Sequence, residues 1–404
     1  MIDLDTPLTQ GYYDVKPHFC SAVPLIMFLK YVFARVIWQP LEHGACLIID
    51  DPLLKSRYGQ CDFRKQLDLM KRHGFTTDIA FILWNWRRTS NNEAAFFRRE
   101  MNRFSVSIHG CDHIAAEFGG TETGDLTGRA QLAQFRMRRH QERTGVRHDP
   151  IMVFPQGVFS APCPDVLKRT GYIAAVNTEV VPVGNSEIKT RIRDVWDVAI
   201  TRYGSFPIFT RRYAHHDLEN FAFDLLLGKP CLIVAHHAFF KNEGQSVIEL
   251  VENLSSLHCK LQWRPLGEVL RRACRQRANS AGSHEYWMYC QELSIKNNGS
   301  DTALFTVRKK EEDPAVISRV KGASGEKEWN VCDGHIEFSV SIPGGEERLF
   351  KVIYEEDSGM IGKPRKLKYR MYVAARRLLS ELRDECMFYG DRFKRISPIS
   401  PRHF

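Results

Sequence analysis

Residues 45–52 read ACLIIDDP, a short apolar run that ends in two adjacent carboxylates and a proline. Such a run predicts a β-strand, and similar runs recur along the chain with helical patterns between most of them. The strand-like runs lie at residues 45–49, 78–83, 104–108, 151–154, 172–176, 197–200 and 231–235. The helical patterns lie at residues 63–72, 93–102, 128–143, 164–169, 218–227 and 246–257. This alternation predicts parallel β/α units, and seven units favour a barrel over an open two-sided sheet.

The chain changes character near residue 286. Strand-like runs lie at residues 286–295, 303–307, 336–342 and 349–354, with Asn-Asn-Gly and Pro-Gly-Gly turns between them. No helical pattern intervenes, so we expect a small antiparallel β-domain, most simply a sandwich. Residues 272–284 have the composition of a linker, and residues 26–38 have the spacing of a helix that packs on the barrel. The expected division is an N-terminal extension (1–43), the barrel (44–270), the β-domain (285–357) and a helical tail (361–404).

The positive charge of the chain is concentrated in the tail. The 404 residues carry 57 basic and 48 acidic side chains, a formal net charge of +9. Residues 361–404 hold 12 of the basic and 4 of the acidic residues, which leaves the rest of the chain nearly neutral. A neutral body has no general excess of positive charge for phosphates, so we expect no nucleic-acid partner.

The tail has the pattern of a basic amphipathic helix. Leu367, Met371, Ala374, Leu378 and Leu382 share one helical face. Such a helix suits an anionic membrane surface or an acidic partner. The alternative is a helix that docks on the protein and leaves its basic face in solvent.

The N-terminus and the cysteines bear on the cellular compartment. The first five residues, MIDLD, are acidic and unlike a secretory signal, and no apolar run approaches the ~20 residues of a spanning helix. The 11 cysteines are odd in number and include no C-x-x-C pair. That argues against a disulfide framework and against a thiolate zinc site. We therefore expect a cytoplasmic protein with reduced thiols, associated with membranes at most peripherally.

Carboxylate and imidazole side chains follow two of the expected strands. Asp50 and Asp51 end the first strand, and residues 108–113, IHGCDH, place His109 and His113 after the third. Adjacent carboxylates repel each other, and a cation relieves that repulsion. One aspartate with two histidines makes an open three-ligand metal set, beside which a second carboxylate can act as general base. For either motif alone, an ordinary surface loop is the alternative.

Two further segments end expected strands. Residues 154–160, FPQGVFS, predict a rigid loop close to a ligand at Pro155, Gln156 and Gly157, with a plain turn as the alternative. Residues 235–240, AHHAFF, place His236 and His237 at the end of the last apolar strand. One of these two histidines can face the site and protonate a leaving group.

Aromatic and basic residues gather in two other loops. Trp84 and Trp86 lie in WNWRR, and Arg211 and Arg212 lie in FPIFTRRY. At the mouth of a barrel, such aromatic rings suit stacking on sugars, and arginines suit anionic or carbonyl groups. The alternative is that the aromatic side chains only cover the barrel edge.

The order of these motifs resembles the polysaccharide deacetylase (NodB-homology) family over about residues 44–240. The resemblance implies a distorted (β/α)7 barrel that uses a divalent metal, most often zinc, to hydrolyse N- or O-acetyl groups of sugars. It further implies that Asp51, His109 and His113 hold the metal and that Asp50 is the general base. His236 would be the general acid, with His237 as the alternative.

The chain also departs from the family pattern. Pro52 stands where the first motif usually has glycine, and Gly110 stands where the second usually has serine or threonine. The arginine that usually begins the third motif and sets the base is missing from FPQG, so Arg211 or Arg212 would have to replace it. For the aspartate that orients the acidic histidine, Asp194 and Asp197 are the candidates.

The sequence thus predicts a metal-dependent hydrolase that removes acetyl groups from a sugar or polysaccharide. The missing arginine and the added β-domain motivate the alternative, a catalytically impaired barrel that binds glycans or acts as a scaffold. A different metal hydrolase on the same barrel ranks lower, because a two-metal phosphoesterase would need more carboxylates and histidines at other strand ends.

Overall fold

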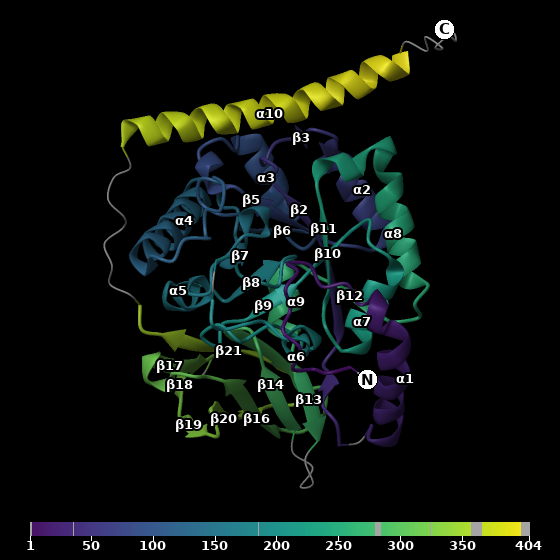
Figure 1. The fold of residues 1–404 in the computed structure, drawn as a ribbon, viewed down its shortest axis with the longest axis vertical. Coiled ribbons are helices and arrows are strands. Elements are labelled where there is room, and N and C mark those ends of the chain that lie inside the picture. Colours follow the sequence, from purple (N-terminus) through teal and green to yellow (C-terminus); the bar gives the residue numbers. More distant parts are fainter. Residues whose placement is uncertain are drawn as a thin grey trace.

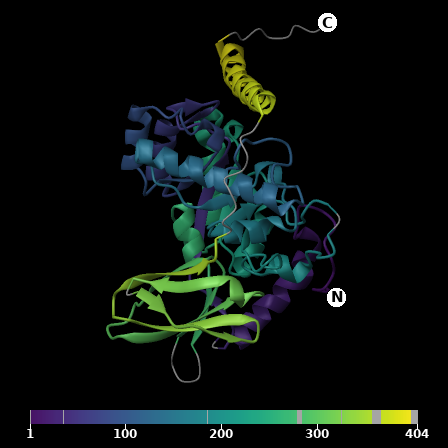
Figure 2. The same ribbon diagram turned by 90° about the vertical axis from the view of Figure 1, so that its left-hand side faces the viewer.

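The computed structural model describes residues 2–34, 36–184, 186–278, 284–323, 325–356 and 366–396, with side chains of the last helix as far as residue 386. Three parts follow one another along the longest axis (Figure 1). A sandwich of two β-sheets lies at one end, an α/β unit lies in the middle, and one long helix crosses the other end. A view turned by 90° shows the same order (Figure 2).

A parallel sheet forms the centre of the α/β unit. Its main path runs in the order β10-β11-β2-β5-β6-β7-β8-β9, with β12 paired to β2. The strands are β2 (His43–Asp50), β5 (Thr77–Phe81), β6 (Phe104–Ile108), β7 (Ile151–Val153), β8 (Ala174–Asn177), β9 (Ile208–Thr210), β10 (Arg212–Tyr213), β11 (Cys231–Ala235) and β12 (Leu261–Trp263). The two end strands, β9 and β10, are separated in the chain by Arg211 alone, so the sheet must bend round on itself. No ladder between described residues joins β9 to β10, so a closed barrel is not shown.

Apolar side chains bury both faces of this sheet. Along β2, Leu47 and Ile49 enter one hydrophobic cluster, whereas Cys46 and Ile48 enter another. Burial on both faces is why the strands read as continuous apolar runs rather than as alternating ones. The same burial makes Asp50, at the end of β2, a carboxylate that is only 5% exposed.

Helices surround the sheet. They are α1 (Lys16–Val32), α2 (Phe63–His73), α3 (Asn91–Arg99), α4 (Thr123–Thr144), α5 (Cys163–Arg169), α6 (Ile192–Trp196), α7 (Leu218–Leu226), α8 (Gln245–Ser255) and α9 (Leu266–Arg272). Short 3-10 turns are η1 (Leu83–Asn85), η2 (Pro155–Gly157), η3 (His237–Phe240), η4 (Asn242–Gly244) and η5 (Pro314–Val316). Local signals fix the helix ends: Asp62 accepts hydrogen bonds from the first turn of α2, and Gly74 ends α2 in the left-handed region.

One expected strand is wrong, and several short strands, among them β9, β10 and β12, were missed. Residues 197–200 do not form a strand; Ile200 makes only an isolated bridge to Ile208. Val198, Ala199 and Ile200 are apolar because they are buried, which does not require ladder pairing. The segment 206–213, expected to be a loop, supplies β9 and β10, and β12 adds a strand beside β2.

The C-terminal β region is a sandwich of two sheets. One sheet has the order β1-β13-β14-β16-β20-β19 and the other β15-β21-β17-β18. The strands are β1 (Gln39–Pro40), β13 (Arg275–Ala278), β14 (His284–Met288), β15 (Glu292–Lys296), β16 (Ala303–Lys310), β17 (Ile317–Gly322), β18 (Gly325–Lys327), β19 (Asn330–Cys332), β20 (His335–Ile342) and β21 (Glu347–Tyr354). All pairs are antiparallel except β14 with β16. Alternate side chains of β20 and β21, such as Phe338 and Phe350, fill the space between the sheets.

Two details of this region differ from the sequence prediction. The run 286–295 is not one strand, because the chain crosses from one sheet to the other between β14 and β15. Residues 275–278, expected in a linker, form β13, which pairs β1 from the N-terminal segment with β14.

The last helix, α10 (Leu367–Ile396), lies across the end of the molecule opposite the sandwich (Figures 1 and 2). A small hairpin of β3 (Arg57–Tyr58) and β4 (Cys61–Asp62) lies beneath it. Among the helices of the described residues, none combines the length and apolar content needed to cross a bilayer.

Candidate metal site

The candidate site lies at the edge of the sheet where the parallel strands end. Asp50 and Asp51 come at the end of β2, and His109 follows β6 directly. Three non-glycine residues here have left-handed backbones: Asp51 with φ 81°, His113 with φ 54° and Gln156 with φ 58°. Such backbones cost energy and persist only where the surroundings hold them.

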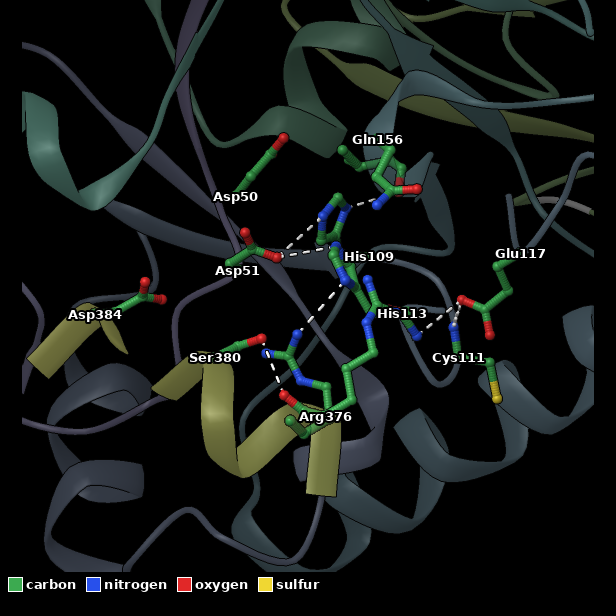
Figure 3. Close-up of polar contacts among 12 residues, drawn as sticks. Asp50, Asp51, His109, Cys111, His113, Glu117, Gln156, Arg376, Ser380 and Asp384 are labelled. Atoms are coloured by element: carbon green, nitrogen blue, oxygen red, sulfur yellow. Dashed lines mark hydrogen bonds and ion pairs between the residues drawn. The ribbon is translucent and has the colours of Figure 1, made fainter. Parts of the chain in front are cut away.

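Asp51, His109 and His113 bring three potential ligand atoms together (Figure 3). The Nε2 atoms of His113 and His109 lie 3.0 Å and 3.5 Å from Oδ1 of Asp51, and all three atoms lie within 4.8 Å of one another. This geometry agrees with the set that the motifs predict.

The donor set fits a divalent cation. Nδ1 of His109 lies 2.9 Å from the carbonyl oxygen of Val153. A carbonyl only accepts, so Nδ1 carries a proton, and in neutral His109 a lone pair of Nε2 faces Asp51. Oδ1 of Asp51 is buried and, among the described residues, makes no hydrogen bond apart from its close contacts with the two imidazoles. Lone pairs of a carboxylate oxygen of Asp51 and of Nε2 of His109 therefore face each other in a buried space, which is the arrangement of metal ligands.

The carboxylates and imidazoles of the site shift one another's pKa. Burial acts to raise the pKa of Asp51, but contacts with His109 and His113 hold that pKa well below its usual value. Burial acts to lower the pKa of His109, but Asp50 and Asp51 raise it overall. The pocket therefore favours positive charge next to its carboxylates.

Arg211 holds Asp50 in a buried, two-pronged ion pair. Its two terminal nitrogens each lie 2.7 Å from one oxygen of Asp50. Burial acts to raise the pKa of Asp50, but Arg211 brings it below its usual value. Arg211 and Arg212 were the two candidates for an arginine that sets the general base, and Arg211 is the one beside Asp50.

Arg212 does not reach the candidate site. Its guanidinium pairs with Asp224 at 2.8 Å and 3.0 Å and also donates to Tyr12, 3.0 Å away, and to the carbonyl of Tyr13. Since Arg212 is only 5% exposed, the expectation that it contacts substrate is not met by its placement. The side chains alternate along the extended segment 211–213, which sends the two arginines to opposite faces.

Glu117 fixes the loop that carries the two histidines. Its carboxylate accepts hydrogen bonds from the backbone N–H groups of Cys111, Asp112 and His113 at 2.7–3.0 Å. Gly110 has φ 65°, and a Cβ there would lie 2.4 Å from Pro155 and 2.5 Å from Glu117. The loop therefore requires glycine at this position.

Cys111, Asp112 and Glu117 form a second cluster of potential ligands. Arg136 enters this cluster and donates to Asp112 at 2.6 Å. The oxygens of Glu117 already accept backbone N–H groups. This cluster therefore braces the histidine loop.

The two histidines after β11 differ in burial. His236 is exposed, and its charge is one of those that lower the pKa of Asp50. His237 is 8% exposed, packs edge-on against Tyr58 and lies 3.6 Å from Asp384 of α10. His237 thus contacts the hairpin and α10, whereas His236 is open to solvent.

Asp194 and Asp197 do not orient either histidine. Asp194 accepts from the backbone of Arg191 at the start of α6. Asp197 accepts from the hydroxyl of Tyr289 and pairs with Arg275 at 3.1 Å. The carboxylate beside His237 comes instead from the C-terminal helix.

The loops predicted to contact substrate follow β5 and β7. Trp84 lies in η1 after β5, and Trp86 follows it; both are partly exposed, and Arg87 stacks on Trp86 with 4.2 Å between its guanidinium carbon and the ring centre. Pro155, Gln156 and Gly157 form η2, whose Pro155 lies against Gly110.

Helix α10 covers the histidine loop. Arg376 donates to the carbonyl of His113, and Nη1 of Arg377 lies 3.5 Å from Nδ1 of His113. The hydroxyl of Tyr369 donates to Asp112 at 2.9 Å. Figure 3 shows Arg376 near His113 and Ser380 one turn further along α10, both on the side away from Asp50.

The same helix contacts the hairpin and the loop after β5. Glu381 pairs with Arg88 at 2.7 Å and with Lys55. Asp384 accepts from Tyr58 at 2.8 Å, and Glu385 pairs with Arg57 at 3.1 Å. Polar contacts therefore hold α10 over the site along several turns.

Sequence reasoning missed Glu117, Tyr58 and the carboxylates of α10. Glu117 lies only four residues beyond His113, but nothing in its type or spacing distinguishes it from a surface glutamate. In α10 no simple spacing reveals them. Glu381 and Glu385 come three and seven residues after Leu378, which places them close to the face of the leucines. Only Asp384 lies well away from that face.

Comparisons with known proteins identify only distant likenesses. No protein-family model matches the sequence, and no curated protein matches it. The chitin deacetylase from the fungal pathogen Colletotrichum lindemuthianum aligns at 14% identity over 58% of this chain and 90% of its own, with a TM-score of 0.36. A family 4 carbohydrate esterase from Streptomyces lividans aligns at 12% identity over 55% of this chain and 91% of its own, with a TM-score of 0.32. A family 4 acetyl xylan esterase from Clostridium thermocellum aligns at 12% identity over 56% of this chain and 89% of its own, with a TM-score of 0.32. Likenesses at this level carry no argument about activity, which must come from the site itself.

Proposed function

We propose that this chain is a metal-dependent hydrolase that removes N- or O-acetyl groups from a sugar or polysaccharide. The observation that carries the proposal is the convergence of Asp51, His109 and His113 beside the Asp50–Arg211 pair. The order of the sequence motifs supports the same class of reaction. The proposal includes a distorted (β/α)7 barrel, which the single residue between β9 and β10 supports.

Asp51, His109 and His113 would hold the metal, and zinc is the proposed ion because this nitrogen and oxygen set leaves a coordination position open. Such a metal, when bound, polarises an acyl carbonyl and acidifies a bound water. Asp50 accepts the proton of the attacking water. Arg211 orients both oxygens of Asp50 and keeps it ionised in spite of burial.

The loop after β7 offers a donor for the oxyanion of the reaction. Pro155 has no N–H, and the N–H of Gly157 donates to the carbonyl of Phe154. The N–H of Gln156, held in a left-handed backbone, is therefore the proposed donor. His236 is the proposed acid for the departing amine or alkoxide, and Trp84 and Trp86 are proposed to stack on the sugar.

One observation favours a second candidate. Arg376 and Arg377 of α10 lie directly over His113, so a substrate of polysaccharide size needs this helix to move. A barrel that α10 keeps covered would act as a glycan-binding or scaffold protein. The cytoplasmic location stays a prediction from the sequence.

Acetate release from a panel of acetylated amino sugars and xylans tests the proposal. Loss of a general base costs ~100-fold or more in rate, so Asp50→Asn of the metal-loaded full chain is expected to lose at least that much kcat. Asp224→Asn, which removes a carboxylate from the equivalent buried pair with Arg212, is the matched control and is expected to keep the rate. Equal rates for Asp50→Asn and the wild type would refute the proposal. Saccharide binding without turnover by the wild type would favour the scaffold.

A further inference from the structure

Helix α10 packs against the protein with its polar side. The residues that face the body are Tyr369, Arg376, Arg377, Glu381, Asp384 and Glu385, each in a polar contact with the site or its surrounding loops. Val373 is the one large apolar side chain of the described part of α10 that is buried. An amphipathic helix on a soluble protein normally buries its apolar stripe instead.

The apolar stripe of α10 points away from the protein. Leu367, Met371, Leu378, Leu379 and Leu382 are between 49% and 70% exposed. Leu367, Met371, Leu378 and Leu382 recur at intervals of four or seven residues, so they share one side of the helix, and Leu379 flanks them. The stripe that the sequence predicts is therefore present, and nothing in the described part of the chain covers it.

The charge around the stripe is positive. Glu381, Asp384 and Glu385 are the acidic residues between 366 and 386, and all three pair with groups of the body. Lys368 and Arg370 are exposed beside the stripe. The body thus neutralises the acidic groups of α10, and the outer side combines apolar with basic side chains.

The shape of the molecule lets a flat surface reach this stripe. Two views at right angles show α10 as the outermost element at its end of the molecule (Figures 1 and 2). Its 30 residues make a rod of about 45 Å at 1.5 Å per residue. A plane can therefore touch the helix along its length without meeting other elements.

We propose that the outer side of α10 docks on an anionic lipid bilayer, with the helix lying in the plane of the surface. Apolar side chains enter the acyl boundary while lysines and arginines contact anionic headgroups. The polar side of the helix meanwhile keeps its contacts with the candidate site, which places that site close to the membrane surface. This inference concerns a surface of α10 and does not depend on the proposed hydrolysis.

One other surface and one other occupant compete with this assignment. Helix α1 also exposes large apolar residues, including Leu25 (58%), Phe28 (59%) and Tyr31 (88%). Of the lysines of α1, Lys16 pairs with Asp217 and Lys30 is partly buried. Helix α1 therefore carries less free positive charge beside its apolar residues than α10 does. A second copy of the chain could also cover the stripe, and it would then bind α10 without lipid.

Co-sedimentation of the full chain with vesicles tests the proposal. The probes are phosphatidylcholine vesicles with and without phosphatidylserine. The double variant Leu378→Glu/Leu382→Glu is compared with Leu304→Glu, which changes a leucine 50% exposed on β16, and with Phe28→Glu on α1. All three changes are at exposed positions, so circular dichroism should show the same fold.

The wild type and both single variants are expected to bind the anionic vesicles and to bind the neutral ones far less. The double variant is expected to bind about tenfold or more weakly, because two leucines lose burial and two negative charges approach the headgroups. Equal binding by the double variant and Leu304→Glu would overturn the proposal, and so would a loss confined to Phe28→Glu. Stripe-dependent dimers that do not bind lipid, measured by light scattering, would assign the surface to a second copy and also overturn it.

Discussion

Removal of Arg211 provides a sharp test of how the site is built. Arg211 and Asp50 are 3% and 5% exposed, and two hydrogen bonds of 2.7 Å join them. Arg211→Met leaves the carboxylate buried without its cation. Breaking one side of a buried pair costs about 3–5 kcal/mol of unfolding free energy. We therefore expect a loss of that size at neutral pH.

The assay is a double-mutant cycle by urea unfolding. In an Asp50→Asn background Arg211 is itself the unpaired buried charge. Arg211→Met then removes that charge instead of exposing a carboxylate, so it should cost about 2 kcal/mol less than in the wild type. Arg212→Met breaks the other buried pair and should destabilise to a similar extent, but its effect should add to that of Asp50→Asn within about 0.5 kcal/mol. A coupling near zero between Arg211 and Asp50, or a loss below about 1 kcal/mol, would refute the reasoning.

Three further predictions concern the loop, the pH dependence and the helix. Gly110→Ala should destabilise the fold by more than Gly74→Ala does and should lower metal retention. Both variants suffer a left-handed backbone strain of ~1–2 kcal/mol, but only Gly110 has neighbours within 4 Å of the added carbon. Equal shifts in melting temperature for the two variants would contradict this. Burial lowers the pKa of His140 to about 4. Between pH 6.5 and 4 this histidine is therefore protonated in the unfolded chain but neutral in the folded chain. Unfolding free energy should fall as pH drops from 6.5 to 4, by about 3 kcal/mol, and His140→Gln should remove that part of the slope. Glu381→Lys should lift α10 and raise the rate of diethyl pyrocarbonate labelling of His113 several-fold; an unchanged rate would show that α10 does not shield it.

Much of the fold could be predicted because the parallel strands are buried on both faces. The runs at 104–108 and 231–235 coincide with β6 and β11. The segment 197–200 was wrongly predicted to be a strand for the same reason, since buried residues are apolar whether or not they pair in a sheet. The three residues of β12 are only partly buried, so no apolar run marks them.

The candidate ligands could be predicted because each follows the end of a strand. Asp51, His109 and His113 need only the sheet to bring them together. Arg211 was one of two possibilities, and alternation along the strand decided between them. Asp384 could not be placed, because its contact with His237 depends on how a separate helix docks across the sheet edge.

Metal content tests the central claim most directly. The full chain, loaded with zinc and passed through a desalting column, should retain one divalent ion per chain by inductively coupled plasma mass spectrometry. Asp51→Asn and His113→Ala should each lose it, whereas Asp50→Asn, which changes the adjacent carboxylate that is not a proposed ligand, should keep it. Stoichiometric metal in both ligand variants would contradict the account.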